Sequence, residues 1–115
     1  MDDLSIFYNP RCSKCRTAQG LLAERGVEAT IVEYLVAPPT VAELGVLMTQ
    51  LGFTDPRDMM RVGEDIYKEL DLAGASGDAL LEAIAAHPIL LQRPIVVKDG
   101  RAVIARPPER LLELL

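Results

Sequence analysis

The segment LSIFYNPRCSKCRTAQG, residues Leu4–Gly20, places a short apolar run directly before a polar turn and a helical pattern. Leu4–Tyr8 is apolar and partly aromatic, and an Asn-Pro step follows it, so we predict a buried strand. From Ser13 the apolar residues recur at helical spacing until Gly26, a residue type that commonly ends helices. A strand that passes so quickly into a helix places Cys12 at the helix N-terminus.

The next segments extend this unit. Ala29–Leu35, ATIVEYL, is β-branched and aromatic and predicts a second strand, which completes a βαβ unit with two parallel strands. Thr40 and Glu43 have the spacing of a capping box, and the helix that they open is expected to end at Gly52. Three more short helices are predicted, at residues 56–61, 65–70 and 79–86.

The clearest local pattern lies near the end of the chain. In PIVVKDGRAVIA, Pro94–Ala105, two β-rich runs flank Asp99 and Gly100, a pair that favours a type I′ hairpin turn. A last short helix is predicted at Glu109–Leu115. The sum is an α/β fold with a mixed four-stranded sheet and a helical insertion between strands two and three, the plan of a thioredoxin-like (glutaredoxin-like) domain. We expect residues 1–115 to form this single domain.

The hairpin also predicts a pair of arginines. With Asp99 and Gly100 as the loop, Arg93 lies opposite Arg106 at the open end of the hairpin, and like charges in that position destabilise a sheet. Each arginine precedes a proline, which keeps its backbone extended. An anion between two guanidinium groups would explain the arrangement, because they suit tetrahedral oxyanions. The alternative is that both point into solvent. If strand three is antiparallel to strand one, both lie beside Cys12.

Composition limits the possible functions. The net charge of -5 and the isoelectric point near 4.8 argue against binding to nucleic acid or to an anionic membrane. The N-terminus lacks the pattern of a secretory signal, and no apolar run is long enough for a membrane span. We therefore expect a cytoplasmic protein. In that compartment a close cysteine pair is more often catalytic than structural.

The two cysteines have separate interpretations. At a helix N-terminus the free backbone N–H groups and the helix dipole favour the thiolate of Cys12, which makes it a candidate nucleophile rather than a small buried hydrophobic residue. Cys15 lies on the same helix face and is either a resolving thiol or a core residue in line with Ala18 and Leu22. A structural zinc site needs four ligands and only His87 could add one, so we expect no metal.

Four motifs together are similar to one family. They are YNPRC, MMRVGEDIYKELDL, HPILLQRPIVV and ARPPE, and they cover essentially the whole chain. Their order and spacing resemble the glutaredoxin-coupled arsenate reductases. This resemblance implies that Cys12 is the catalytic nucleophile that attacks arsenic and that Arg61, Arg93 and Arg106 bind the substrate. Arg61 rests on the resemblance alone. The same resemblance to thioredoxin-like folds predicts a cis peptide bond between Arg93 and Pro94.

The implied reaction is the reduction of arsenate to arsenite, a step of arsenic detoxification, with glutathione as co-substrate and glutaredoxin as partner. It requires no tightly bound cofactor and no metal. Two residues depart from the family pattern. Tyr8 stands where some members have His, which removes a candidate helper for thiolate formation. Many such reductases lack a cysteine at the position of Cys15. An internal disulfide reduced by a thioredoxin-like partner is therefore an alternative to glutathione and glutaredoxin.

Two alternatives follow from the Cys-x-x-Cys motif. The chain also resembles Spx-type regulators, which share the fold, sense oxidation and bind RNA polymerase. It could further be a thiol oxidoreductase of the same fold with another substrate. The complete set of Arg61, Arg93 and Arg106 favours the arsenate reductase.

Overall fold

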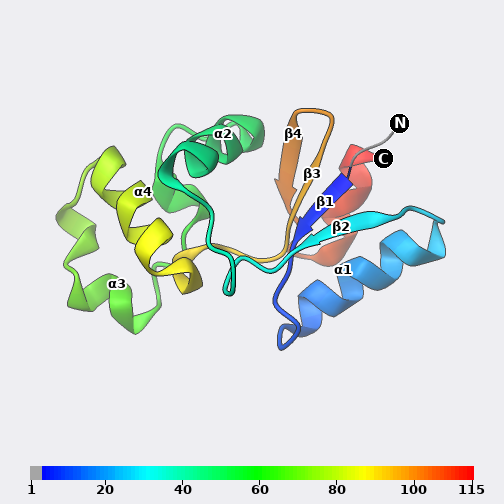
Figure 1. Cartoon of the computed structure of the whole chain (residues 1–115), viewed down its shortest axis with the longest axis horizontal. Helices are drawn as coiled ribbons and strands as arrows, with labels where there is room; N and C mark the ends of the chain where they lie inside the picture. The colour runs from blue at the N-terminus through cyan, green and yellow to red at the C-terminus, as the bar shows by residue number, and fades with distance from the viewer. Residues whose placement is uncertain (1–3) are drawn as a thin grey trace. The chain divides into compact units, whose positions relative to one another are not determined.

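The computed structural model describes residues 4–115, which form two compact units (Figure 1). The sheet unit consists of the chain up to Ala37 together with Arg93–Leu115. The helical unit is the intervening segment, Pro38–Gln92. It corresponds to the helical insertion that the sequence predicts between strands two and three.

The sheet unit contains a mixed four-stranded sheet, as predicted. Its strands follow the order β2-β1-β3-β4, in which β1 is parallel to β2 and β3 is antiparallel to both β1 and β4. Their bounds are β1 Leu4–Phe7, β2 Ala29–Val32, β3 Ile95–Lys98 and β4 Arg101–Ile104.

The hairpin between β3 and β4 has the predicted register, with Lys98 opposite Arg101. Asp99 and Gly100 both have positive φ values, 52° and 77°. A type I′ turn requires positive φ at both central residues, which is why this residue pair fixes the hairpin.

One face of the sheet is covered by α1, Ser13–Glu24, and by the 3-10 helix η4, Pro108–Leu114. The short helix predicted at Glu109–Leu115 is present as a 3-10 helix over Pro108–Leu114. With three residues per turn, a 3-10 helix aligns Pro108, Leu111 and Leu114 on one face. Leu111 belongs to the core of the sheet unit, and Leu112 and Leu114 pack against it. This core consists of Leu4, Ile6, Ala18, Leu22, Val96, Val103, Ala105 and Leu111.

The second strand is shorter than predicted and ends at Val32 instead of Leu35. The chain turns there, since the Tyr34 N–H donates to the Val32 carbonyl and the Val36 N–H to the Glu33 carbonyl, each at 3.0 Å. Tyr34 is fully buried, whereas the Leu35 side chain is 39% exposed. The aromatic residue that suggested a longer strand is therefore a core residue within a turn.

The helical unit begins with α2, Val41–Leu51, and its capping box is confirmed. The Thr40 N–H donates to the Glu43 carboxylate at 2.9 Å, and the Glu43 N–H donates to the Thr40 hydroxyl at 3.1 Å. Gly52 ends the helix with a φ of 78°.

Short helices follow: η1 Pro56–Met59, α3 Asp65–Glu69, η2 Leu72–Gly74, α4 Gly77–Ala86 and η3 Pro88–Leu90. The first ends before Arg61, the predicted end, because Met60 leaves the helix to form a β-bridge with Leu91. No helix among residues 4–115 has both the length and the apolar character needed to cross a membrane.

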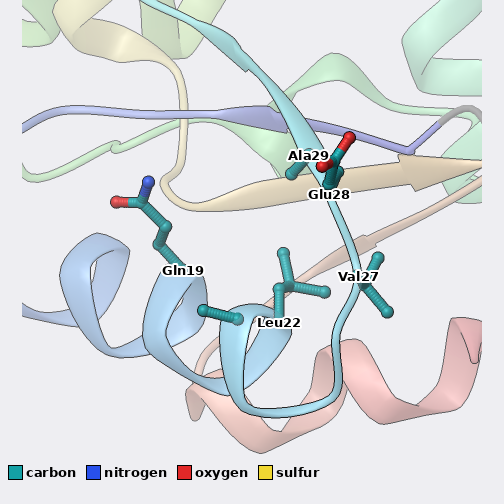
Figure 2. Close-up of a pocket in the computed structure, with 6 residues that line it drawn as sticks. Gln19, Leu22, Val27, Glu28 and Ala29 are labelled. Carbon is teal, nitrogen blue, oxygen red and sulfur yellow. The ribbon is translucent and has the colours of Figure 1, made fainter.

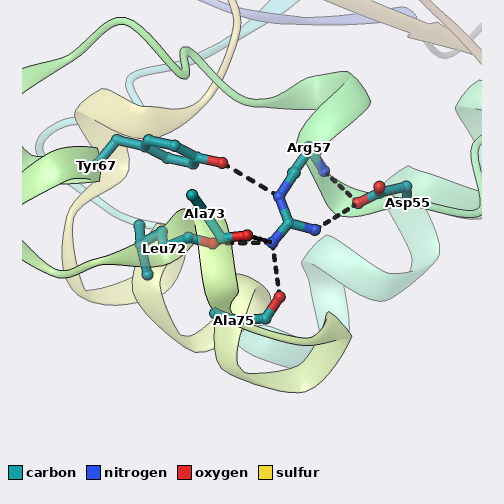
Figure 3. Close-up of polar contacts among 6 residues, drawn as sticks. All are labelled: Asp55, Arg57, Tyr67, Leu72, Ala73 and Ala75. Carbon is teal, nitrogen blue, oxygen red and sulfur yellow. Dashed lines mark hydrogen bonds and ion pairs between the residues drawn. The ribbon is translucent and has the colours of Figure 1, made fainter.

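Arg57, in η1, forms hydrogen bonds to α3 and to the segment that follows it, residues 72–75 (Figure 3). Its Nε donates to the Tyr67 hydroxyl at 3.1 Å, and its Nη1 lies 3.5 Å from the Asp55 carboxylate. Its Nη2 donates at 2.6–3.0 Å to three backbone carbonyls, those of Leu72, Ala73 and Ala75. The guanidinium group thus has structural partners on several sides.

Candidate active site

The candidate site lies at one edge of the sheet, where all four strands bring one end together. Val32, Phe7, Ile95 and Ile104 form the last row of strand pairs at this edge. Three residues lie two positions beyond this row, and the loop that carries Cys12 follows directly from Phe7. These residues are Tyr34 after β2, Arg93 before β3 and Arg106 after β4.

The loop between β1 and α1 is held by local hydrogen bonds. The Asn9 side-chain oxygen accepts from the Arg11 N–H at 3.0 Å, and the Asn9 carbonyl accepts from the Cys12 N–H at 2.9 Å. The Arg16 side chain donates to the Pro10 carbonyl at 2.7 Å. Part of the positive charge near the cysteines therefore braces the loop that presents Cys12.

Cys12 is a free, partly buried thiol at the N-cap of α1. Burial opposes its ionisation, whereas interactions with the backbone and the thiol of Cys15 favour it. The Arg93 side chain and the Lys14 backbone add to this effect, so the pKa of Cys12 is lowered to about 7. Within the described chain the thiol makes no cap hydrogen bond of standard length and angle, so these contacts are best described as electrostatic.

Cys15 is a free thiol that is fully buried. Burial, together with the neighbouring Cys12, raises the pKa of Cys15 to about 11, so it keeps its proton at neutral pH. It lies in the buried stripe of α1 with Ala18 and Leu22, and its thiol also interacts with the Cys12 sulfur. The sequence left open whether Cys15 is a resolving thiol or a core residue, and its position is compatible with both roles.

The structure brings Arg93 and Arg106 together at the open end of the hairpin. The Arg106 Nη1 donates to the Arg93 carbonyl at 2.9 Å, and the Ala105 N–H donates to the Pro94 carbonyl at 2.9 Å, which continues the strand pairing. The peptide bond between Arg93 and Pro94 is cis, as predicted, and so is the bond between Arg106 and Pro107, which we did not predict. Arg93 interacts with Cys12 directly, while Arg106 contacts the site through Arg93.

Tyr34 is a site residue that the sequence analysis missed. Burial raises the pKa of Tyr34 to about 12, and its surroundings include Arg93 and both cysteines. We had placed it within a strand, where alternation gives no reason to single out one aromatic residue. No pattern in the sequence marks it, because its place just beyond the last β1–β2 pair depends on where β2 ends.

Arg61 belongs to the helical unit. Its Nε and Nη2 donate to one oxygen of the Glu64 carboxylate, at 3.1 and 3.0 Å. Its backbone N–H donates to the Leu90 carbonyl at 2.6 Å. In this structure the Arg61 charge is therefore balanced by an acidic side chain of the same unit.

Tyr8, the other departure from the family pattern, packs with its side chain against the core of the sheet unit. A partly buried aromatic ring in this position is a packing residue. The interactions that lower the pKa of Cys12 come from Cys15, Arg93 and Lys14.

A hollow of about 350 Å³ lies elsewhere on the sheet unit, between α1 and the start of β2 (Figure 2). It is lined by Gln19, Leu22, Ala23, Val27, Glu28 and Ala29. Because this lining includes neither a thiol nor a positive charge, the hollow does not suit an oxyanion. Among residues 4–115, no group of three or more His, Cys, Asp or Glu side chains is arranged to hold a metal ion.

The mixed sheet, its order and the helical segment between β2 and β3 define an α/β protein of the thioredoxin-like class, with a cysteine at the N-cap of its first helix. A model of the ArsC family matches residues 7–114. The chain belongs to the ArsC family.

Three relatives illustrate the similarity. An arsenate reductase of Neisseria meningitidis serogroup A is 50% identical over 117 aligned residues, which cover 100% of both chains. An uncharacterized protein of Escherichia coli strain K12, YfgD, is 47% identical over 97% of this chain and 96% of its own. The solved structure of an arsenate reductase from Vibrio cholerae has a TM-score of 0.96 and 46% identity, over 98% of each chain.

Proposed function

We propose that this protein reduces arsenate to arsenite, with Cys12 as the nucleophile and with glutathione and glutaredoxin as the source of electrons. The observation that carries the proposal is a thiol at the N-cap position of α1, with a pKa of about 7, next to the positive charge of Arg93. The names of full-length relatives, among them the arsenate reductase of Neisseria meningitidis, support the choice of substrate.

In this proposal the arginines bind the substrate. Arg93 stays charged, because its interactions with Cys12 and Tyr34 outweigh burial and raise its pKa above the ordinary value. A guanidinium fork beside the sulfur can hold an arsenate oxygen while the thiolate approaches arsenic. Arg106 steadies the Arg93 backbone and adds a second positive charge. Arg61 is included on the resemblance alone.

The chemistry has three steps. The Cys12 thiolate bonds to arsenic, and one arsenate oxygen takes up protons and leaves as water. The thiolate of glutathione then attacks the Cys12 sulfur, the sulfur–arsenic bond breaks, and its electron pair stays on arsenic, which is reduced from As(V) to As(III). Arsenite departs, and glutaredoxin reduces the mixed disulfide between Cys12 and glutathione.

A second candidate uses Cys15 in place of glutathione. The Cys15 thiol interacts with the Cys12 sulfur, so it could attack that sulfur and form an internal disulfide as arsenite leaves. A dithiol partner of the thioredoxin type would then restore both thiols. The same pair could reduce a substrate other than arsenate. Either reaction needs a reducing compartment, and we place it in the cytoplasm.

The first prediction tests the nucleophile. Arsenate-dependent oxidation of NADPH, measured in a coupled assay with glutathione, glutaredoxin and glutathione reductase, should occur with the parent protein. It should be abolished by Cys12→Ser, because no other thiol stands at the helix N-terminus. Unchanged melting temperature in the variant shows that the fold is intact. Normal turnover by Cys12→Ser would overturn the proposal, and stable co-purification of an inactive parent with RNA polymerase would favour the regulator.

The second prediction separates the two electron routes by means of Cys15→Ser. If glutathione resolves Cys12, the variant keeps its turnover with glutathione and glutaredoxin. If Cys15 resolves Cys12, the variant stops after one equivalent of arsenite, and mass spectrometry of the turning-over parent detects a Cys12–Cys15 disulfide. We expect the first outcome, since the buried Cys15 thiol with a pKa of about 11 is a weak nucleophile at neutral pH.

A further inference from the structure

Two buried polar atoms at the site have no hydrogen-bond partner among residues 4–115. They are the hydroxyl oxygen of Tyr34 and the Nε of Arg93. Buried polar groups in folded proteins are nearly always paired, because an unpaired one forfeits its hydration. Two such atoms in neighbouring side chains therefore require an explanation.

The fold holds the Tyr34 ring in a fixed place. The ring packs against Phe7, with the two centroids 6.4 Å apart and the planes tilted by 45°. Phe7 is the residue from which the Cys12 loop departs, and it pairs with Val32 of β2 and with Ile95 of β3. A side chain fixed against Phe7 is thus anchored to the three strands that position the site.

Besides burial, the groups that most affect the ionisation of the Tyr34 hydroxyl are Arg93, Cys15 and Cys12. None of them is a carboxylate. Arg57 and Arg61, by contrast, each contact an acidic side chain, which offsets their charge. A neutral hydroxyl differs in this respect, because it can accept a hydrogen bond from a guanidinium without cancelling the positive charge.

We propose that Tyr34 is a positioning residue for the oxyanion site. In this role the Arg93 Nε–H donates to the Tyr34 hydroxyl oxygen, which satisfies both unpaired atoms. With Nε fixed in this way, the two terminal amino groups of the fork face the Cys12 sulfur and an oxyanion bound beside it. The effect on arsenate rests on the proposed function, whereas the effect on the Cys12 thiolate does not.

The test is Tyr34→Phe, which keeps the ring against Phe7 and removes only the hydroxyl. The pH dependence of Cys12 alkylation by iodoacetamide, followed by mass spectrometry, reports the pKa of the thiol without any arsenate. We expect its midpoint to rise by about half a pH unit or more, since a freely moving Arg93 stabilises the thiolate less well. The KM for arsenate should rise about threefold to tenfold, with a smaller change in kcat.

The matched control is Tyr67→Phe. It also removes a tyrosine hydroxyl next to an arginine, in this case the acceptor for Arg57 Nε. Tyr67→Phe should lower the melting temperature and leave the midpoint of Cys12 alkylation unchanged. Tyr34→Phe should raise that midpoint and leave the melting temperature close to that of the parent. A raised midpoint supports the positioning role even if the parent protein fails to reduce arsenate. An alkylation profile identical to that of the parent would overturn the proposal and leave Tyr34 a core residue only.

Discussion

Cys12 and Cys15 carry the same side chain three positions apart, yet their pKa values are about 7 and about 11. The difference comes from position on the helix. Cys12 stands before the first turn, where backbone N–H groups and Arg93 offset the cost of burial. Cys15 lies one turn later in the core, where burial dominates and the charge on Cys12 disfavours a second thiolate.

The third prediction concerns the pH dependence of this thiol. Alkylation of Cys12 should be half-maximal near pH 7 and should fall as the pH is lowered through that value, because the thiolate is the reactive form. By linkage, ionised Cys12 favours the folded state above its unfolded pKa of about 8.5, and this contribution is lost as the pH falls through 7.

Cys12→Ser is the control, since the protonated Cys15 should react slowly across this pH range. A midpoint near that of an unperturbed cysteine, about 8.5, would contradict the account of the helix N-terminus.

The roles of single residues could be predicted from sequence where local geometry determines them. Cys12 follows from a strand-to-helix junction, which only a few residues define. The environment of Tyr34 depends on a turn, on the ring of Phe7 and on Arg93, a residue distant in sequence. No local pattern carries that information, which is why Tyr34 was missed.

At the scale of elements, the hairpin shows why some predictions succeed. Asp99 and Gly100 permit one turn type, the turn fixes the register of β3 and β4, and the register places Arg93 beside Arg106. The predicted ends of β2 and of η1 were wrong, because tertiary contacts determine where these two elements end. Tyr34 is drawn into the core, and Met60 pairs with Leu91.

The fourth prediction concerns Arg57, which joins η1 to the segment after α3. Arg57→Lys keeps the positive charge but loses the planar fork that contacts three carbonyls and a hydroxyl. We expect amide hydrogen exchange around residues 72–75 to become several-fold faster, because three carbonyls of this segment lose hydrogen bonds to Arg57.

Arg110→Lys is the matched control, since its ion pair with Glu113 is solvent-exposed and contributes little. If amide hydrogen exchange in Arg57→Lys equals the parent rate, Arg57 does not stabilise this segment.

At the scale of the whole molecule, the proposed substrate-binding residues are divided between the two units. Cys12, Arg93 and Arg106 belong to the sheet unit, whereas Arg61 belongs to the helical unit and is paired with Glu64. The sequence could not reveal this ion pair, because Arg61 was identified by resemblance and not by its surroundings. The division allows the binding of arsenate to be tested separately from the activation of the thiol.

The fifth prediction uses this separation. Arg61→Ala should raise the KM for arsenate about tenfold or more, the value of one charge-assisted hydrogen bond, and leave the Cys12 alkylation profile unchanged. Glu64→Gln should lower the KM, since it releases Arg61 from its acidic partner. If Arg61→Ala and the parent have equal KM values, Arg61 is a structural residue of the helical unit.

The contact between the two cysteines has a consequence for the survival of the protein under oxidising conditions. A thiolate that exists at neutral pH is also attacked by hydrogen peroxide, which converts it to a sulfenic acid and, with further peroxide, to forms that cells rarely repair. The protonated Cys15 thiol interacts with the Cys12 sulfur. We infer that a sulfenic acid on Cys12, which no longer carries the thiolate charge that disfavours ionisation of Cys15, can condense with the Cys15 thiol. This step releases water and leaves a disulfide that an ordinary thiol reductant reopens. By this inference, a residue that packs in the core also protects the reactive thiol from permanent damage.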